Sequence, residues 1–325
     1  MSNKIRIGIM GYGNIGKGVE SAIKQNSDMT LSAVFSRRDP SSVQTEAPVY
    51  PVDDIASFTE KIDVMILCGG SATDLPDQGP MTASLFNTVD SFDTHARVPE
   101  YFEKMNAAAK KGDTLCLYSC GWDPGLFSMM RVLFESMLPQ GSETTFWGPG
   151  VSQGHSDAIR RIEGVADARQ YTLPIDSAIQ AARDGNADDL TTRQKHKRHC
   201  YVTVKEGADK EAITKTIVNM PNYFSDYDTS VEFMDHETLL KEHGAIPHGG
   251  FVIRNGKTGD NNSETMEFSL KLDSNPEFTA SVLVACARAV HRMRSNGTRG
   301  ALSMLEVPLA HFSSTDIADL RAGKI

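Results

Sequence analysis

This sequence lacks long apolar runs, paired cysteines and an excess of positive charge. None of its apolar stretches approaches the roughly 18 consecutive residues of a membrane-spanning helix. Its first residues, MSNKIRIGIMG, lead directly into a strand-like run without the basic and apolar regions of a signal peptide. We therefore expect a cytoplasmic protein with no membrane partner.

Cysteine content and charge balance exclude further classes of protein. The five cysteines form no C-x-x-C pair, and an odd number of them is typical of reduced thiols rather than of disulfides or a metal site. Acidic residues outnumber Lys and Arg by 42 to 33, which gives a net charge of -9. Nucleic-acid binders need a basic surface to displace counterions, so a small-molecule ligand is favoured and no nucleic acid or metal is expected.

The composition is otherwise that of an ordinary globular protein, with 40% hydrophobic and 23% charged residues. A chain of 325 residues exceeds the size at which single hydrophobic cores usually stop growing, so two domains are expected. No internal repeat or low-complexity segment argues for a solenoid or an extended tail.

The first third of the chain alternates strand patterns with helix patterns. Helices are expected at 18–25 and from Pro99 onward, the latter with apolar residues at helical spacing. Strands are expected at 5–10, 29–35, 63–68, 87–90 and 114–119. Strands separated by helices form parallel sheets, so we predict an α/β fold with a Rossmann-type, doubly wound parallel sheet.

After about residue 122 the pattern changes to that of a second, α+β domain with a mixed or antiparallel sheet. Strands are expected at 201–205, 231–234 and 265–272. Within the last of these, four apolar residues alternate with polar ones, which indicates one buried face: Met266, Phe268, Leu270 and Leu272. A long helix at 276–296 is expected to lead the chain back to the first domain.

A glycine turn, Gly11-Tyr12-Gly13-Asn14-Ile15-Gly16, follows the first strand and opens the first helix. In such a turn Gly11 allows the tight bend, Gly13 lets the backbone approach a pyrophosphate, and Gly16 allows close packing of helix on strand. The pattern predicts a dinucleotide site.

The second strand ends in Ser36-Arg37-Arg38, where NAD-specific units often carry an acidic residue. Two guanidinium groups and a hydroxyl suit the 2′-phosphate of NADP. NADP is therefore the expected cofactor.

Further segments follow the third, fourth and fifth strands, where the carboxyl ends of parallel strands form the cofactor crevice. Cys68-Gly69-Gly70-Ser71 follows the third strand, Asp90-Ser91-Phe92-Asp93 ends the fourth, and Ser119-Cys120-Gly121-Trp122-Asp123-Pro124 ends the fifth. The last two segments are expected to face the nicotinamide, and each carries a carboxylate, although helix capping or turn formation is an alternative role for a single Asp.

Several longer strings are more specific than the glycine turn. They include Gly121-Trp122-Asp123-Pro124-Gly125, Phe146-Trp147-Gly148-Pro149-Gly150, the segment 152–157, Pro247-His248-Gly249-Gly250 and the segment 272–276. With these strings in this order, the chain resembles the meso-diaminopimelate dehydrogenase family over nearly its whole length. The resemblance implies a homodimer that catalyses NADP-dependent, reversible oxidative deamination of the D-centre of meso-2,6-diaminopimelate, giving L-2-amino-6-oxopimelate and ammonia, for lysine and cell-wall precursor synthesis.

The resemblance also implies a division of the chain and a set of contacts. Residues 1–123, completed by about 273–325, would bind the dinucleotide, and 124–272 would bind substrate and form the dimer. The implied NADP contacts are Tyr12, Gly13, Asn14, Ile15, Ser36, Arg37, Arg38, Cys68, Gly69, Gly70, Ser71, Ser91, Phe92, Asp93, Cys120, Gly121, Trp122, Asp123 and Pro124. The implied substrate contacts are Asp93, Asp123, Trp147, Gln153, Gly154, Thr172, Arg198, His248 and Asn275.

The chemistry of such a reaction suits these residue types. Asp93 and Asp123 can accept hydrogen bonds from the reacting amino group and stabilise the iminium that develops, and one of them, or a water it orders, can act as general base. Arg198 offers a fork for the distal carboxylate and His248 a further donor. Without the resemblance, Arg198 would belong to an ordinary solvated basic run, His196-Lys197-Arg198-His199.

Two other functions are compatible with the glycine turn. One is another NADP enzyme of amino-acid biosynthesis, such as a homoserine dehydrogenase or a dihydrodipicolinate reductase, against which the Trp-Asp-Pro-Gly string argues. The other is a non-catalytic NADP sensor, against which the paired carboxylates argue. The letters His155-Ser156-Asp157 do not indicate a hydrolase, because triads are assembled by the fold and neighbouring side chains diverge.

Overall fold

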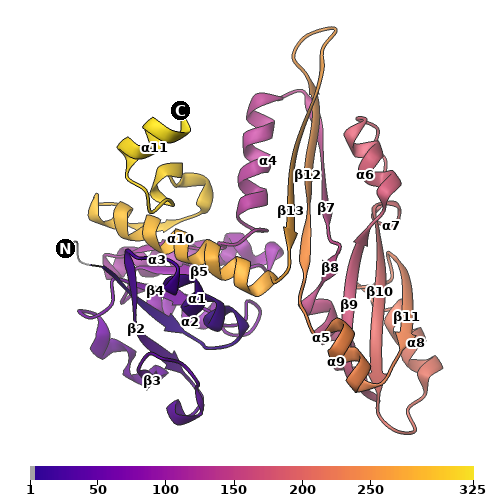
Figure 1. Ribbon diagram of the computed structural model, residues 1–325, viewed down its shortest axis with the longest axis horizontal. Helices are drawn as coiled ribbons and strands as arrows, with labels where there is room; N and C mark the ends of the chain where they lie inside the picture. The colour runs from indigo at the N-terminus through magenta and orange to yellow at the C-terminus, as the bar shows by residue number, and fades with distance from the viewer. Residues whose placement is uncertain (1–3) are drawn as a thin grey trace. The chain divides into compact units, whose positions relative to one another are not determined.

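The computed structural model describes residues 4–325, which form two compact units (Figure 1). The first unit contains the chain up to Met129 and from Pro276 to Ile325, and the second contains Met130–Asn275. No helix of residues 4–325 is long and apolar enough to cross a membrane.

The first unit is built on a seven-stranded parallel sheet in the order β14-β6-β5-β4-β1-β2-β3. Its strands are β1 (Ile5–Met10), β2 (Met29–Ser36), β3 (Val49–Pro51), β4 (Val64–Leu67), β5 (Thr88–Asp90), β6 (Leu115–Leu117) and β14 (Gly300–Leu302). Its helices are α1 (Asn14–Lys24), α2 (Leu75–Ala83), α3 (Val98–Gly112), α10 (Asn275–Ser295) and α11 (Ile317–Lys324), with short 3₁₀ turns at Pro40–Ser42, Val52–Phe58, His95–Arg97, Met304–Glu306 and Leu309–His311. The order reverses between β1 and β4, as in a doubly wound Rossmann sheet, so the predicted fold of this part is confirmed.

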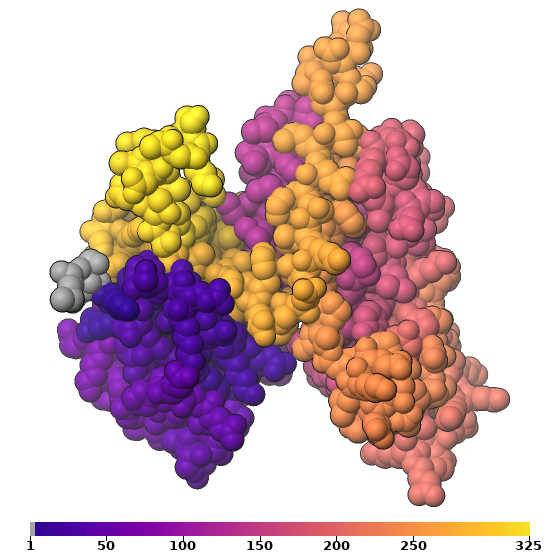
Figure 2. Space-filling model, viewed as in Figure 1, coloured from indigo at the N-terminus to yellow at the C-terminus, as the bar shows by residue number. Residues whose placement is uncertain are grey.

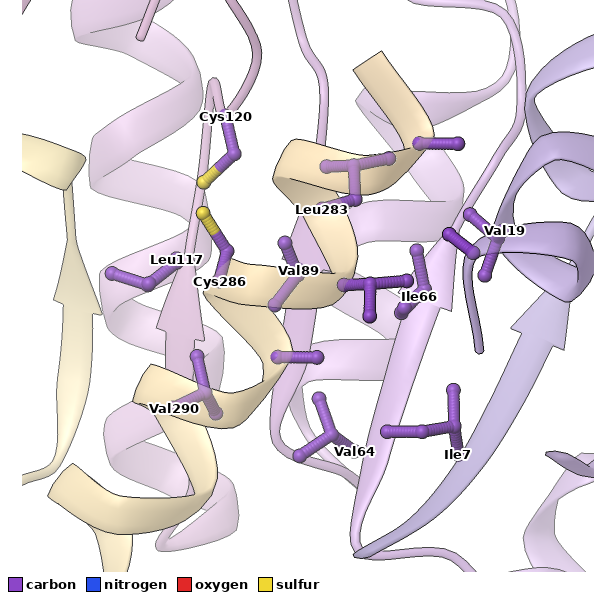
Figure 3. Close-up of a cluster of buried hydrophobic side chains, with 14 of the residues drawn as sticks. Ile7, Val19, Val64, Ile66, Val89, Leu117, Cys120, Leu283, Cys286 and Val290 are labelled. Atoms are coloured by element: carbon purple, nitrogen blue, oxygen red, sulfur yellow. The ribbon is translucent and has the colours of Figure 1, made fainter. Parts of the chain in front are cut away.

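Both faces of this sheet are covered. On one face, Ile7, Val64 and Ile66 pack against Leu283 and Val290 of α10 (Figure 3). On the other, a second cluster joins the strands to α2 and α3 through buried side chains that include Met10, Met65, Leu67, Leu75, Met105 and Ala109. Burial on both faces explains why the strands appear in the sequence as continuous apolar runs.

The position of α10 gives a stability prediction. Leu283 is fully buried, so Leu283→Ala should lower the free energy of unfolding by about 2 to 5 kcal/mol through lost transfer energy and a residual cavity. Leu305→Ala, at a side chain that is 50% exposed, should change it by less than about 0.5 kcal/mol. Denaturant unfolding of both variants measures the difference, and equal small effects would contradict the assigned packing.

The second unit contains two sheets. The order β11-β10-β9-β8 forms a mixed sheet, with β10 parallel to β11 and antiparallel to β9, and the order β13-β12-β7 forms an antiparallel sheet. The strands are β7 (Gly141–Trp147), β8 (Gly150–Val151), β9 (Val165–Pro174), β10 (His196–Val204), β11 (Asp228–Phe233), β12 (His248–Lys257) and β13 (Ser263–Leu272). The helices are α5 (Gln153–Arg160), α6 (Asp176–Arg183), α7 (Thr192–Lys195), α8 (Lys210–Val218) and α9 (His236–His243), while α4 (Leu126–Met137) spans the boundary between the units.

Two expectations for this unit need correction. The strand expected at 201–205 begins at His196, so the basic run that would be solvated by itself lies inside β10, with His196 and Arg198 buried. The apolar alternation on β13 is confirmed, but only Leu272 is buried, while Met266, Phe268 and Leu270 are half-buried. The physical reason is that β13 is the outer strand of its sheet, and the β12–β13 hairpin projects from the unit (Figure 2).

Candidate functional site

The glycine turn has the geometry that a dinucleotide requires. Gly11 has a φ of +90°, which favours glycine, and a Cβ at Gly16 would lie 2.4 Å from the carbonyl oxygen of Gly11. A Cβ at Gly13 would meet nothing within 4 Å, so the backbone there is open to a ligand. The residues at this turn therefore fit a pyrophosphate at the start of α1.

The basic residues that follow β2 are held against two neighbouring loops. Arg38 donates from Nη2 to the carbonyl oxygen of Tyr12 at 2.6 Å, and its backbone N–H donates to Oγ of the buried Ser36 at 3.0 Å. Arg37 forms an ion pair with Asp74 at 2.9 Å and its side chain is 68% exposed. The arrangement leaves the Arg37 guanidinium accessible to a 2′-phosphate.

Arg37→Ala is expected to raise the KM for NADP about ten- to a hundredfold, because hydrogen bonds to charged groups contribute about 1.5 to 3 kcal/mol each. The KM for NAD should change little, because NAD has no 2′-phosphate. Steady-state kinetics with both cofactors measures the ratio. Arg6→Ala is the control, since Arg6 pairs with Asp63 at the amino end of the same sheet. Equal changes for NADP and NAD in the Arg37 variant would contradict the assignment.

Glu20 is a buried carboxylate on α1 that sequence reasoning missed. It accepts hydrogen bonds from the Tyr12 hydroxyl, from Oγ1 of Thr45 at 2.8 Å and from the backbone N–H of Glu46 at 3.2 Å. Burial alone would raise the pKa of Glu20, but these hydrogen bonds outweigh it and hold the pKa below its usual value. Glu20 thereby fixes the glycine turn to the segment that follows the basic residues.

The two predicted catalytic carboxylates follow strands that are neighbours in the sheet, β5 and β6. Asp93 is exposed, and its backbone N–H donates to Oγ of Ser71 at 2.9 Å. Asp123 is half-buried in a tight turn that only glycine can close, since a Cβ at Gly125 would lie 1.9 Å from the carbonyl oxygen of Gly121. This requirement explains the glycine of the Trp-Asp-Pro-Gly string, and the first unit carries both carboxylates.

In the second unit, Arg198 is a buried cation without a buried anion to match it. It lies on β10 opposite Thr172 of β9, donates from Nη1 to Oγ1 of Thr172, and stacks over the Tyr227 ring at 3.9 Å. Its Nε has no hydrogen-bond partner, and within residues 4–325 no carboxylate pairs with it. Burial lowers the pKa of Arg198, so the charge is held at a cost that an anionic ligand would offset.

Other predicted substrate residues of the second unit are His248, Gln153 and Gly154. His248 is 9% exposed, a Cβ at Gly150 would lie 2.4 Å from its Cα, and Gly150 pairs with Thr172. Burial lowers the pKa of His248 and the charge of Arg198 lowers it further, which places the two side chains near each other. Gln153 and Gly154 are exposed in the first turn of α5.

Trp147 is held by a residue that sequence reasoning missed. Its backbone N–H donates to Nε2 of His196 at 3.0 Å, and the two rings lie 5.8 Å apart. Burial lowers the pKa of His196 to about 4, so the ring is neutral near pH 7 and Nε2 can accept this bond. His196 therefore joins Trp147 to β10, the strand of Arg198.

The remaining predicted residue, Asn275, lies at the start of α10, where its backbone N–H donates to the carbonyl oxygen of Ile246 at 2.9 Å. The structure thus groups Thr172, Arg198 and His248 in the second unit, while Asp93 and Asp123 belong to the first. Across residues 4–325, no group of three or more His, Cys, Asp or Glu side chains is placed to hold a metal ion.

The strand order, the glycine turn and the carboxylates at the strand ends define a dehydrogenase of the Rossmann class. Residues 121–274 match the family model described as the diaminopimelic acid dehydrogenase C-terminal domain. The chain is 57% identical to the meso-diaminopimelate D-dehydrogenase of Lysinibacillus sphaericus over 98% of both chains. It belongs to the meso-diaminopimelate D-dehydrogenase family.

Solved structures agree with this membership. The diaminopimelate dehydrogenase of Corynebacterium glutamicum in complex with DAP superposes with a TM-score of 0.95 at 46% identity, over 100% of both chains. An engineered D-amino acid dehydrogenase bound to NADP+ superposes with a TM-score of 0.90 at 44% identity, over 99% of this chain and 100% of the other. The predicted family and fold are confirmed.

Proposed function

We propose that the chain catalyses NADP-dependent, reversible oxidative deamination of meso-2,6-diaminopimelate at its D-centre, giving L-2-amino-6-oxopimelate and ammonia. The observation that carries this is the buried Arg198, which no carboxylate of residues 4–325 neutralises. A guanidinium in this state fits a carboxylate of the substrate. The relatives named above, which are called meso-diaminopimelate dehydrogenases, and the structures with DAP or NADP+ support the same substrate and cofactor.

The two ends of the substrate would have different partners. The residues of the first unit proposed above would hold NADP, and the bound cofactor would supply the hydride acceptor for the D-centre. Asp93 and Asp123 accept hydrogen bonds from the reacting amino group and stabilise the positive charge that develops as the iminium forms. One of these carboxylates, or a water that it orders, takes the proton that the ammonium group must lose first.

The distal L-end would be bound by the second unit. Arg198 binds the carboxylate through paired N–H donors, with Thr172 and His248 beside it, and Trp147, Gln153, Gly154 and Asn275 complete the surroundings. Because the end held at Arg198 is the one that does not react, this clamp determines which stereocentre meets the nicotinamide. The first unit, which carries the residues proposed for NADP, is accordingly the dinucleotide-binding domain and the second the substrate-binding domain.

NADPH formation with separate isomers tests this function. At alkaline pH, where the amine is more easily deprotonated, the meso isomer should be oxidised and the LL isomer should not, because the LL isomer lacks a D-centre. Comparison with simple D-amino acids shows how far the distal clamp is required. A folded protein that gives no turnover with the meso isomer would overturn the proposal.

We further propose a homodimer formed by the second unit. Val132, Leu133 and Met137 of α4 are 46%, 42% and 57% exposed, and β13 leaves the apolar face of Met266 and Phe268 half-exposed. Phe268 of β13 lies opposite Val252 of β12, so the two side chains are on the same face of the sheet. Light scattering should give twice the chain mass, and Leu133→Glu should shift it toward the monomer. A wild-type monomer would contradict the proposal.

We also propose that the enzyme acts in the cytoplasm, in lysine and cell-wall precursor synthesis.

A further inference from the structure

Asp90 is a fully buried carboxylate that the proposed reaction does not use directly. It ends β5 and is 0% exposed. Burial raises its pKa to about 6, although hydrogen bonds from Phe92, Ser119 and Tyr101 act in the opposite direction. A carboxylate in such surroundings is unfavourable unless its oxygens are hydrogen-bonded.

One oxygen of this carboxylate joins the two loops that carry Asp93 and Asp123. Oδ1 accepts the backbone N–H of Phe92 at 3.0 Å and the backbone N–H of Ser119 at 3.0 Å. Phe92 directly precedes Asp93, and Ser119 begins the segment that leads to Asp123. The carbonyl oxygen of Asp90 also accepts the N–H of Cys120 at 2.8 Å, so a single residue fixes both loops.

Ser119 lies in a backbone conformation that needs such support. Its φ is +54°, a left-handed value that is uncommon for a residue other than glycine, and it redirects the chain after β6. Its hydroxyl oxygen is buried without a hydrogen-bond partner, so the side chain does not hold this conformation. The hydrogen bond that the backbone N–H of Ser119 donates to Asp90 does. Conformations of this kind persist where the surroundings determine them.

The other oxygen fixes the orientation of the carboxylate. Oδ2 accepts the hydroxyl of Tyr101, which lies on α3, at 2.9 Å. The Tyr101 ring stacks on Phe92 with centroids 4.1 Å apart. A Cβ at Gly79 of α2 would lie 2.2 Å from the Tyr101 oxygen, so this side chain is closely confined. Asp90 therefore cannot turn without disturbing the Asp93 loop.

We propose that Asp90 is a positioning residue for the dehydrogenase reaction, and that its carboxylate holds the loops of Asp93 and Asp123 in the geometry that meets the reacting amino group. This inference rests on the proposed function. It assigns no contact between Asp90 and substrate or cofactor.

The test compares kcat with cofactor affinity. Asp90→Leu should lower kcat for meso-2,6-diaminopimelate about a hundredfold, the loss expected for a small misplacement of catalytic groups. The Kd for NADPH, measured by fluorescence, should rise by much less than kcat falls, because the glycine turn and Arg37-Arg38, which follow β1 and β2, stay in place and only the contacts from the two loops are disturbed. Asp90→Asn keeps an oxygen for the two N–H donors and should restore most of kcat.

Two further variants keep the test decisive. Asp28→Leu removes the carboxylate that pairs with Arg288 at 2.6 Å, before β2 at the amino end of the sheet, and should lower the melting temperature without lowering kcat. Tyr101→Phe removes only the Oδ2 contact and should cause an intermediate loss of kcat. If Asp90→Leu does not fold, the comparison of Tyr101→Phe with Asp90→Asn takes its place. Unchanged kcat in folded Asp90→Leu, or in Tyr101→Phe if the former is unfolded, would overturn the inference.

Hydrogen exchange separates this inference from the proposed function. The amides of 91–94 and 119–123 should lose protection together in Asp90→Leu, or in Tyr101→Phe to a smaller extent, but not in Asp28→Leu. A wild-type protein with no turnover would overturn the proposed function, and the exchange pattern would still report whether Asp90 holds the two loops. Unchanged protection in both loops would count against Asp90.

Discussion

Arg198→Met is expected to lower kcat/KM for meso-2,6-diaminopimelate about a hundredfold or more, because truncating one partner of a buried, hydrogen-bonded charge pair costs about 2 to 5 kcal/mol. The melting temperature should stay the same or rise. In the free protein Arg198 is 8% exposed and no carboxylate of residues 4–325 pairs with it, so methionine removes an uncompensated buried charge while filling similar space. Steady-state kinetics and thermal unfolding measure the two effects.

Arg254→Met is the matched control for Arg198. Arg254 is another buried arginine of the second unit, at 6% exposure, but its Nε donates to the carbonyl oxygen of Leu138 at 2.9 Å and Glu143 lies 3.9 Å from its Nη1. Its replacement should lower the melting temperature and leave kcat/KM nearly unchanged. If Arg198→Met instead lost stability and kept activity, the result would contradict the proposal that Arg198 binds the distal carboxylate of the substrate.

Asp123→Asn should lower kcat about a hundred- to a thousandfold, because removing one preorganised electrostatic interaction costs about 2.7 to 4 kcal/mol in the barrier. Asparagine keeps the shape of the side chain but cannot neutralise the positive charge that develops on the amino group. The Kd for NADPH should change little. Stopped-flow measurement of NADPH formation isolates the chemical step.

Asp113→Asn is the control for this variant. Asp113 lies before the amino end of β6, whereas Asp123 follows its carboxyl end, and Asp113 pairs with Arg294 at 2.8 Å and Arg299 at 2.7 Å. It should keep the wild-type kcat. A near-normal rate in Asp123→Asn would refute the role given to that carboxylate and leave the substrate assignment intact.

The parts of the fold that could be predicted from sequence are those with strong local patterns. β1 and β4 lie in the middle of a sheet covered on both faces, so their apolar runs are continuous and visible. β3 and β14 have three residues each and lie at the two edges, where so short a pattern carries little information. The start of β10 was missed because His196 and Arg198 are basic letters that the fold buries.

The candidate site shows the same division. The residues of the glycine turn are consecutive in the chain, and so are Ser36, Arg37 and Arg38, so the role of each string could be proposed from its spacing. The burial of Arg198 depends on Thr172 and Tyr227, which reach it only through the fold. His196 and Asp90 were missed as supporting residues because each accepts a backbone N–H that is distant in sequence, that of Trp147 for His196 and that of Ser119 for Asp90, and no side-chain motif records such contacts.

Transfer of deuterium tests the central claim most directly. Meso-2,6-diaminopimelate labelled with deuterium at its D-carbon should pass the label to NADP, and the substrate labelled at its L-carbon should give unlabelled NADPH. Mass spectrometry of the NADPH and of the amino-oxopimelate product reads both results. This outcome is predicted because, in the proposed function, Arg198 binds the carboxylate of the L-end and the D-centre is the end that reacts. Deuterium transferred from the L-carbon, or no transfer from either substrate by folded protein, would contradict the account.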